Sequence, residues 1–246
     1  MAANDLGVAL STLEPLSDPS PGGSGALGAP GVPEVPEDVL AELRGTWTPR
    51  PAPDNAGRAA RHRLAEATRR LVEAVKLVDP EGDADALKSV ADDVSDLAAR
   101  ISAMPSTPDR TPDHADMQLH ERSPFVGAAN PLAPPMELVA DGPVIRAHAV
   151  FGAAYEGPIG RVHGGYVAAA FDEVMGVAQS GAGFLGMTAY LTVRLRRGTP
   201  LRERIDYEAE VTRVEGRKVW VEARSYDASG ALVADAEGLF VRARAV

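Results

Sequence analysis

The residues best suited to chemistry lie together in the second half of the chain, where a His-Gly-Gly turn leads into an apolar segment that contains an acid. The turn is His163-Gly164-Gly165, and the acid is Asp172. Glycines before a helix let backbone N–H groups approach a ligand closely, and the helix dipole favours negative charge there. Such an end can hold an oxyanion, while a carboxylate about two turns further on serves as base or nucleophile. The pattern is typical of acyl transfer.

Asp172 is the strongest catalytic candidate, because a carboxylate in the apolar run from Ala169 to Met175 costs free energy if it is buried without partners. From the residues alone, the alternative is an acid that points to solvent or forms an ordinary salt bridge. Glu173 points about 100° away on the same helix and is expected at the surface.

The turn itself offers further groups. His163 can donate to an acyl carbonyl or simply shape the turn, and Gly164 and Gly165 offer N–H groups to an oxyanion or merely a tight helix entry. No metal site is expected: no second histidine lies at ligand spacing from His163, and the chain has no cysteine.

These residues belong to a longer ordered pattern. HGG-x6-D is preceded by Tyr155–Val162 and followed by Met187–Leu191, Arg196–Leu201 and Val214–Lys218. With this set, residues 120–246 resemble the hotdog-fold acyl-CoA thioesterases of the PaaI-like group, and are most similar in pattern to the thioesterase superfamily member 4 type. The resemblance implies hydrolysis of acyl-CoA to free acid and CoA, with no cofactor besides the coenzyme A of the substrate. It also implies a homodimer or tetramer with shared active sites.

The resemblance assigns roles to residues. Asp172 attacks the thioester carbonyl or activates water, and Thr188, from the neighbouring subunit, orients that water; the alternative for Thr188 is an ordinary strand threonine. Gly157 stands where many PaaI-type relatives carry Asn, which favours the member 4 type. Guanidinium and ammonium groups suit the phosphates of CoA. The candidates, whose alternative is solvated charge at strand ends, are Arg194, Arg196, Arg197, Arg217 and Lys218.

Two other functions stay open. A hotdog enoyl-thioester hydratase would use an Asp/His or Glu/His pair on a different motif, and no such pair stands in the sequence. A non-catalytic acyl-CoA-binding sensor or scaffold would use the N-terminal helices as its output. Release of free thiol from acyl-CoA discriminates between these functions and hydrolysis.

Composition and charge limit the classes of partner that the sequence predicts. The net charge of −10 lies mostly in residues 1–119, which hold 11 basic and 20 acidic residues, against 14 and 15 in the remainder. No uniform basic patch suggests nucleic acid, and no apolar run reaches membrane-spanning length. Met1–Asp5 lacks the basic region of a signal peptide, so a cytoplasmic protein is expected.

The front half is predicted to have three parts. Residues 1–56 form a mostly disordered Pro/Gly-rich tail with a short helix at Glu37–Arg44, and residues 105–135 form a Pro-rich connector of extended chain. Residues 57–104 form a helical hairpin that Asp83 caps. Its two apolar stripes should pack on the C-terminal domain or on a second subunit. These stripes are Leu64, Thr68, Leu71, Val75 and Val78, then Leu87, Val90, Val94, Leu97 and Ile101.

Residues 136–246 form the hotdog domain. The pattern predicts an α+β fold in which one helix, His163–Gln179, lies on an antiparallel sheet; the hotdog wrapping comes from the resemblance. Hairpin turns are expected at Gly216 and Gly230. The predicted strands are Met136–Ala140, Val144–Phe151, Gly186–Arg197, Glu203–Val214, Lys218–Asp227 and Ala231–Arg244.

Overall fold

The computed structural model of the chain describes residues 56–105, 121–134, 136–141, 144–184 and 186–242. The tail predicted over residues 1–56 falls almost wholly outside the described residues, and so does the short helix predicted within it. The same holds for residues 106–120 of the predicted connector.

Six antiparallel strands form one sheet in the order β1-β2-β4-β5-β6-β3. Their bounds agree with the predicted strands to within two residues. The hairpin turns fall at Gly216 and Gly230, whose φ angles of 55° and 80° suit glycine. The strands are β1 (Glu137–Asp141), β2 (Val144–Val150), β3 (Gly186–Leu195), β4 (Arg204–Glu215), β5 (Lys218–Tyr226) and β6 (Leu232–Arg242).

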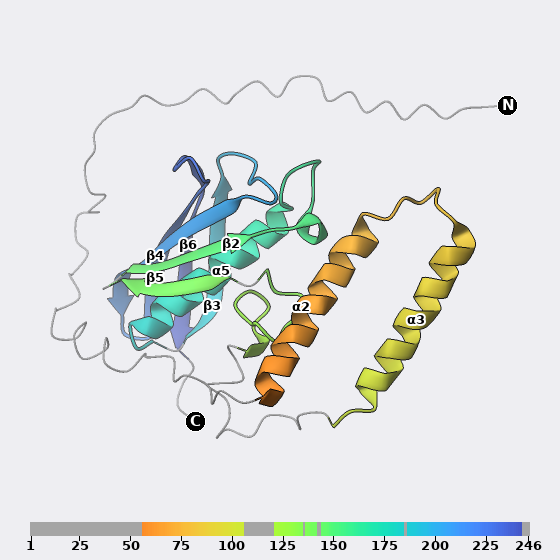
Figure 1. The fold of residues 1–246 in the computed structure, drawn as a ribbon. Coiled ribbons are helices and arrows are strands. Elements are labelled where there is room, and N and C mark those ends of the chain that lie inside the picture. Colours follow the sequence, from red (N-terminus) through yellow and green to blue (C-terminus); the bar gives the residue numbers. More distant parts are fainter. Residues whose placement is uncertain (1–55, 106–120, 135, 142–143, 185, 243–246) are drawn as a thin grey trace, which may run out of the picture. The chain divides into compact units, whose positions relative to one another are not determined.

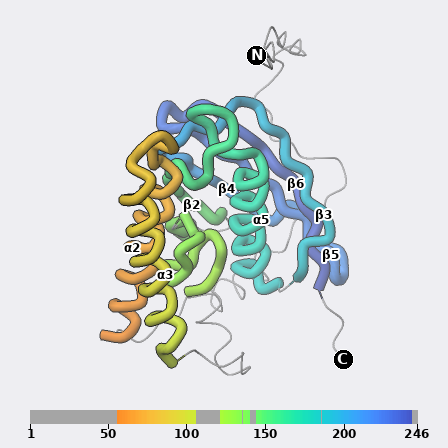
Figure 2. The backbone as a smooth tube through the Cα atoms, turned by 90° about the vertical axis from the view of Figure 1, so that its right-hand side faces the viewer, coloured from red at the N-terminus to blue at the C-terminus, as the bar shows by residue number. Residues whose placement is uncertain are grey.

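Helix α5 (Gly164–Gly181) lies along one face of this sheet (Figures 1 and 2). Phe171 packs edge-on against Tyr207 of β4, with ring centroids 5.5 Å apart. β4 alternates, since Ile205, Tyr207 and Ala209 are buried while the residues between them are not. An antiparallel sheet wrapped on one central helix is the hotdog fold. The apolar stripe of the helix is buried throughout: Val167, Ala170, Phe171, Val174 and Ala178.

The connector before β1 is built from turns, so the prediction of extended chain is wrong for its described part. Ser123 Oγ accepts hydrogen bonds from the N–H groups of Phe125 and Val126 at 3.1 and 3.2 Å. Asn130 Oδ1 accepts one from the Leu132 N–H at 2.9 Å. Side-chain acceptors of this kind stabilise turns. The turns bring Phe125 into the core, where it is 6% exposed.

Two helices, α2 (Ala56–Lys76) and α3 (Ala84–Ser102), lie in the segment predicted to be a hairpin. Asp83 caps α3 as predicted, because its Oδ1 accepts the N–H groups of Asp85 and Ala86 at 2.9 and 3.1 Å. No helix within the described ranges is both long and apolar enough to cross a membrane.

Helix α2 contacts the rest of the described chain through a polar stripe and not through its apolar one. Residues at helical spacing make these contacts, and Ala65 is the buried residue among them. The apolar stripes stay open: Val75 of α2 is 61% exposed, Val90 of α3 is 52% exposed, and no residue of α3 is buried. Packing of these stripes on the C-terminal domain is therefore wrong for the described chain; packing on a second subunit stays a prediction. The polar stripe is Arg58, His62, Arg69 and Glu73.

Candidate active site

A tight loop delivers the chain to the His-Gly-Gly turn. The loop starts with the 3-10 helix η2 (Ala153–Tyr155) and is closed by an antiparallel bridge. The His163 N–H then donates to the Tyr155 carbonyl at 2.9 Å. Gly157 lies so close to the turn that an added Cβ would stand 2.8 Å from the Cα of His163. A side chain at this position would require the turn to shift, so glycine permits this close approach.

His163 caps the N-terminus of α5. Its backbone is extended, with φ −60° and ψ 132°, and its Nδ1 accepts the Gly165 N–H at 3.0 Å. A ring nitrogen that accepts carries no proton, so the hydrogen bond assigns the proton of the neutral imidazole to Nε2. The exposed ring therefore presents an Nε2–H donor, in keeping with the predicted contact to an acyl carbonyl.

The two glycines of the turn differ in role. The prediction that both offer N–H groups to an oxyanion is wrong for Gly165, because its N–H already binds His163 Nδ1. The Gly164 N–H is the first of the helix, has no intrahelical acceptor, and makes no hydrogen bond within the described residues. An added Cβ at Gly164 would lie 3.2 Å from Leu195 Cδ1, so glycine keeps this helix end close to β3.

Asp172 lies about two turns further along α5 and is paired with a strand hydroxyl. Thr188 Oγ1 of β3 donates to Asp172 Oδ1 at 2.7 Å. The pair forms within one chain because α5 packs against β3. This corrects the implication of the resemblance that Thr188 comes from the neighbouring subunit. The carboxylate is half-buried and the threonine is exposed, so the second carboxylate oxygen can be reached by water.

A second contact between α5 and β3 sets the position of Thr188. Gln179 is 4% exposed; its Oε1 accepts the Gly186 N–H at 2.9 Å and its Nε2 donates to the Gly186 carbonyl at 3.2 Å. The side chain thus pairs with β3 as another strand would, two residues before Thr188. The sequence analysis did not select Gln179. The signal was a lone amide on the buried face of the helix, two turns beyond Asp172.

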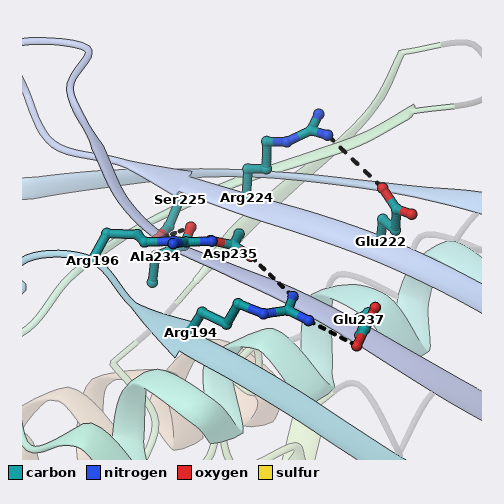
Figure 3. A network of polar contacts seen from close by, with 8 residues as sticks. All are labelled: Arg194, Arg196, Glu222, Arg224, Ser225, Ala234, Asp235 and Glu237. Atoms are coloured by element: carbon teal, nitrogen blue, oxygen red, sulfur yellow. Dashed lines mark hydrogen bonds and ion pairs between the residues drawn. The ribbon is translucent and has the colours of Figure 1, made fainter. Parts of the chain in front are cut away.

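Two of the five cations expected to bind CoA are already engaged in ion pairs (Figure 3). Arg194 contacts Asp235 at 3.3 Å and Glu237 at 3.0 Å, and Arg196 contacts Asp235. Partial burial acts to raise the pKa of Asp235, but the hydrogen bonds from Arg196 and Arg194 outweigh it and hold that pKa below its ordinary value. These two arginines are largely neutralised by acids on the neighbouring strand.

The five cations also lie at two different ends of the sheet. Strand pairing aligns Leu195 with Ala234 at one end, and both Met187 and Lys218 with Val241 at the other. Arg194, Arg196 and Arg197 therefore lie at the end where α5 begins, while Arg217 and Lys218 lie at the opposite end. One phosphate group cannot be held by all five within a chain. Arg197 remains: within the described residues its side chain makes no hydrogen bond or ion pair, although its charge helps to lower the pKa of Asp227.

Comparison with known proteins places this site in a family. The model of the thioesterase superfamily matches residues 159–234, which include the turn, Asp172 and Thr188. A crystal structure of a thioesterase superfamily protein is 33% identical, covers 77% of this chain and 93% of its own, and superimposes with a TM-score of 0.68. The chain belongs to the thioesterase superfamily.

More remote matches were also found among solved structures. A hypothetical thioesterase from Streptococcus pneumoniae, solved with coenzyme A, is 15% identical over 44% of this chain and 91% of its own, with a TM-score of 0.42. The PaaI protein of the phenylacetic acid degradation operon of E. coli is 14% identical over 46% of this chain and 83% of its own, with a TM-score of 0.43. At these values neither structure bears on the activity of this chain.

The 33%-identical match extends beyond the hotdog domain. Residues 121–246 are about half of the chain, so a match over 77% of it reaches into the N-terminal part. The matched family protein therefore has a counterpart to some of the sequence that precedes the hotdog domain.

Proposed function

We propose that this chain hydrolyses acyl-CoA thioesters to a free acid and coenzyme A. Membership of the thioesterase superfamily supports thioester hydrolysis as the general reaction. The observation that carries the proposal is the hydrogen bond between Thr188 Oγ1 and Asp172 Oδ1. It leaves a solvent-accessible carboxylate on the same helix as the unbonded Gly164 N–H.

In the first route, Asp172 acts as general base. The Thr188 hydroxyl uses its one proton on Asp172, so it can only accept from a water, while Asp172 Oδ2 takes a proton from that water. The water oxygen adds to the thioester carbonyl carbon, and the Gly164 N–H and His163 Nε2–H donate to the oxyanion. Collapse breaks the C–S bond, and the leaving thiolate takes up the proton that Asp172 received.

In the second route, Asp172 is the nucleophile. A carboxylate oxygen adds to the carbonyl carbon and expels CoA thiolate, and water then hydrolyses the mixed anhydride. An unlabelled first acid from a single turnover in H₂¹⁸O identifies the second route. General-base attack puts ¹⁸O into the first acid released, whereas attack by Asp172 followed by water addition at its own carboxyl carbon leaves that acid unlabelled. Either way water is the only co-reactant, and we propose that no metal or redox cofactor takes part.

The proposal for CoA as the thiol rests on charge. Arg197 lies at the end of the sheet where α5 begins and, unlike Arg194 and Arg196, forms no ion pair with an acid of the described chain, although its charge helps to lower the pKa of Asp227. A guanidinium at this end can hold a phosphate of CoA while the thioester lies at the helix terminus. Arg217 donates to the Arg242 carbonyl at 3.1 Å at the far end, and with Lys218 it is too distant to serve the same phosphate in that chain.

We also propose that the working form is a homodimer, either alone or as half of a tetramer. β3 is an edge strand that carries the catalytic threonine and exposes large apolar side chains: Met187 is 72% exposed, Tyr190 46% and Leu195 55%. Open apolar edges favour association. A second subunit on β3 would cover this edge and form a wall beside Asp172, although the Asp172–Thr188 pair itself needs one chain only.

The experiment that tests the proposed function measures free thiol released from a panel of acyl-CoAs that differ in chain length and aromaticity. The expected result is turnover of at least one class that is absent without enzyme. Tight binding of acyl-CoA without any thiol release would favour the sensor instead, and release of a hydrated acyl-CoA would favour a hydratase.

A further inference from the structure

The polar stripe of α2 leads directly to the loop that holds the His-Gly-Gly turn. Glu73 Oε1 accepts the Ala153 N–H at 2.9 Å and Oε2 accepts the Ala154 N–H at 3.2 Å. These N–H groups begin η2, and the Tyr155 carbonyl that ends η2 accepts the His163 N–H at 2.9 Å. Two hydrogen-bonded steps therefore join a carboxylate of the N-terminal helix to the residue that caps α5.

The loop is shaped to receive this carboxylate. An added Cβ at Gly152 would lie 2.5 Å from Glu73 Oε2, so only glycine lets the two oxygens reach the N–H groups. Arg202 contacts Glu73 Oε1 at 3.4 Å, and its N–H donates to the Phe151 carbonyl at 2.8 Å. It does so with φ 59°, a left-handed conformation that residues other than glycine rarely adopt. Glu73 and Arg202 thus together hold the start of η2 to α2.

The ring of Tyr155 transmits the position of η2 to the first turn of α5. It packs edge-on against Phe151 and against Tyr166, with centroids 5.5 and 5.0 Å apart. Its hydroxyl donates to the Leu132 carbonyl at 2.9 Å. Burial raises the pKa of this phenol to about 12, so it stays a donor at neutral pH. A shift of η2 would move Tyr155, and with it both the cap residue and the first turn of the helix.

We propose that Glu73 is a positioning residue for the active site: through η2 it sets the place of His163 and of the Gly164 N–H, so that the N-terminal helix completes a site whose reacting groups all lie in the hotdog domain. This inference rests on the proposed hydrolysis. Glu73 lies outside residues 159–234, the segment that the family model matches. Because groups misplaced by about 1 Å can cost about a hundredfold in rate, the effect on turnover should be large.

Other anchors keep α2 attached when Glu73 is changed. Arg58 Nε and His62 Nε2 contact the two oxygens of Glu121 at 2.9 and 2.6 Å. Arg69 donates to the Asn130 carbonyl at 2.9 Å. Loss of the Glu73 carboxylate should therefore loosen η2 without detaching the helix.

The test compares Glu73→Ala, Glu73→Gln and Gly152→Ala in the full-length protein. Glu73→Ala removes both acceptors and should lower kcat about ten- to a hundredfold with KM within about threefold. Glu73→Gln keeps one acceptor and should fall between it and wild type. Gly152→Ala displaces the carboxylate from the other side and should reproduce Glu73→Ala. Glu66→Gln is the matched control, because within the described residues that exposed side chain pairs only with Arg70 on the same helix, and it should leave both constants unchanged.

Hydrogen exchange gives a readout that does not depend on hydrolysis. In Glu73→Ala and Gly152→Ala, exchange should rise in residues 153–166 and stay at the wild-type level in β4 and β5. Wild-type exchange there in both variants, or wild-type kcat in variants whose exchange has risen, overturns the positioning role. If wild type releases no thiol while exchange rises as expected, the link from α2 to the turn stands and the proposed function fails.

Discussion

Replacement of Gln179 by Leu tests how the site is held together. The leucine keeps the size of a side chain that is 4% exposed, but it leaves the Gly186 N–H and carbonyl without their partners. Each unsatisfied buried group costs about 1–3 kcal/mol. Gly186 is half-buried, so water recovers part of this, and a total near 2 kcal/mol is expected. For a protein of this size that corresponds to a Tm lower by about 4–8 °C.

Differential scanning calorimetry and thiol-release kinetics on the same samples make the comparison. Because Gln179 fixes β3 two residues before Thr188, kcat should fall about tenfold even at temperatures where the variant is fully folded. Ser95→Ala is the control: its hydroxyl donates to the Ala91 carbonyl of its own helix at 2.8 Å, so Tm should move by less than about 2 °C. A Gln179→Leu variant with the Tm and kcat of wild type would refute the reasoning.

Three further predictions follow from the same contacts. Thr188→Val should lower kcat roughly tenfold or more, while Thr188→Ser should retain most of the wild-type kcat. Mixed dimers of Thr188→Val and Asp172→Asn chains should show the mean activity of the two parent variants, since the Asp172–Thr188 pair forms within one chain. Activity well above that mean would contradict a pair within one chain. Burial acts to raise the pKa of Glu73 and Glu121, but their hydrogen bonds prevail and lower it from 4.5. Their contribution to stability is therefore present above about pH 4.5 and is lost as pH falls through the lowered values. Tm should be level from pH 7 down to about pH 5, and a fall in Tm over that range as large as the fall below pH 5 would count against this. Arg197→Ala should raise KM for acyl-CoA severalfold at low salt and less at high salt, whereas Arg217→Ala at the far end should not; equal effects of the two refute the assignment.

The sheet and its helix could be predicted closely because their signals are local. Alternation along β4 gives one buried face, and glycines at the β4–β5 and β5–β6 turns mark where the chain reverses. The cap residue and the acid of α5 could be named for the same reason, since HGG and Asp172 share one helix.

The parts that sequence did not yield depend on contacts between distant segments. Periodicity identified the apolar stripe of α2 but could not tell that its polar residues would meet Glu121 and the N–H groups of η2, which lie some fifty or more positions away. Arg194 and Arg196 form ion pairs with Asp235 because β3 pairs with β6, and the linear sequence does not show which strands pair. The assignment of Thr188 to the neighbouring subunit likewise came from the resemblance, and the packing of α5 against β3 in one chain corrected it.

The most direct test of the central claim is the hydrolysis rate of Asp172→Asn beside that of Glu173→Gln. Both changes replace a carboxylate by an amide of the same size at adjacent positions of α5, but Glu173 accepts from Ser123 Oγ at 2.7 Å, while Asp172 faces Thr188. Asp172→Asn should lower kcat for acyl-CoA by roughly 10²–10⁴, the range for a lost acid–base group, with Tm little changed. Glu173→Gln should stay within about threefold of wild type. Near-wild-type turnover in a folded Asp172→Asn protein, or an equal loss in both variants, would contradict the assignment of Asp172 as the reacting carboxylate.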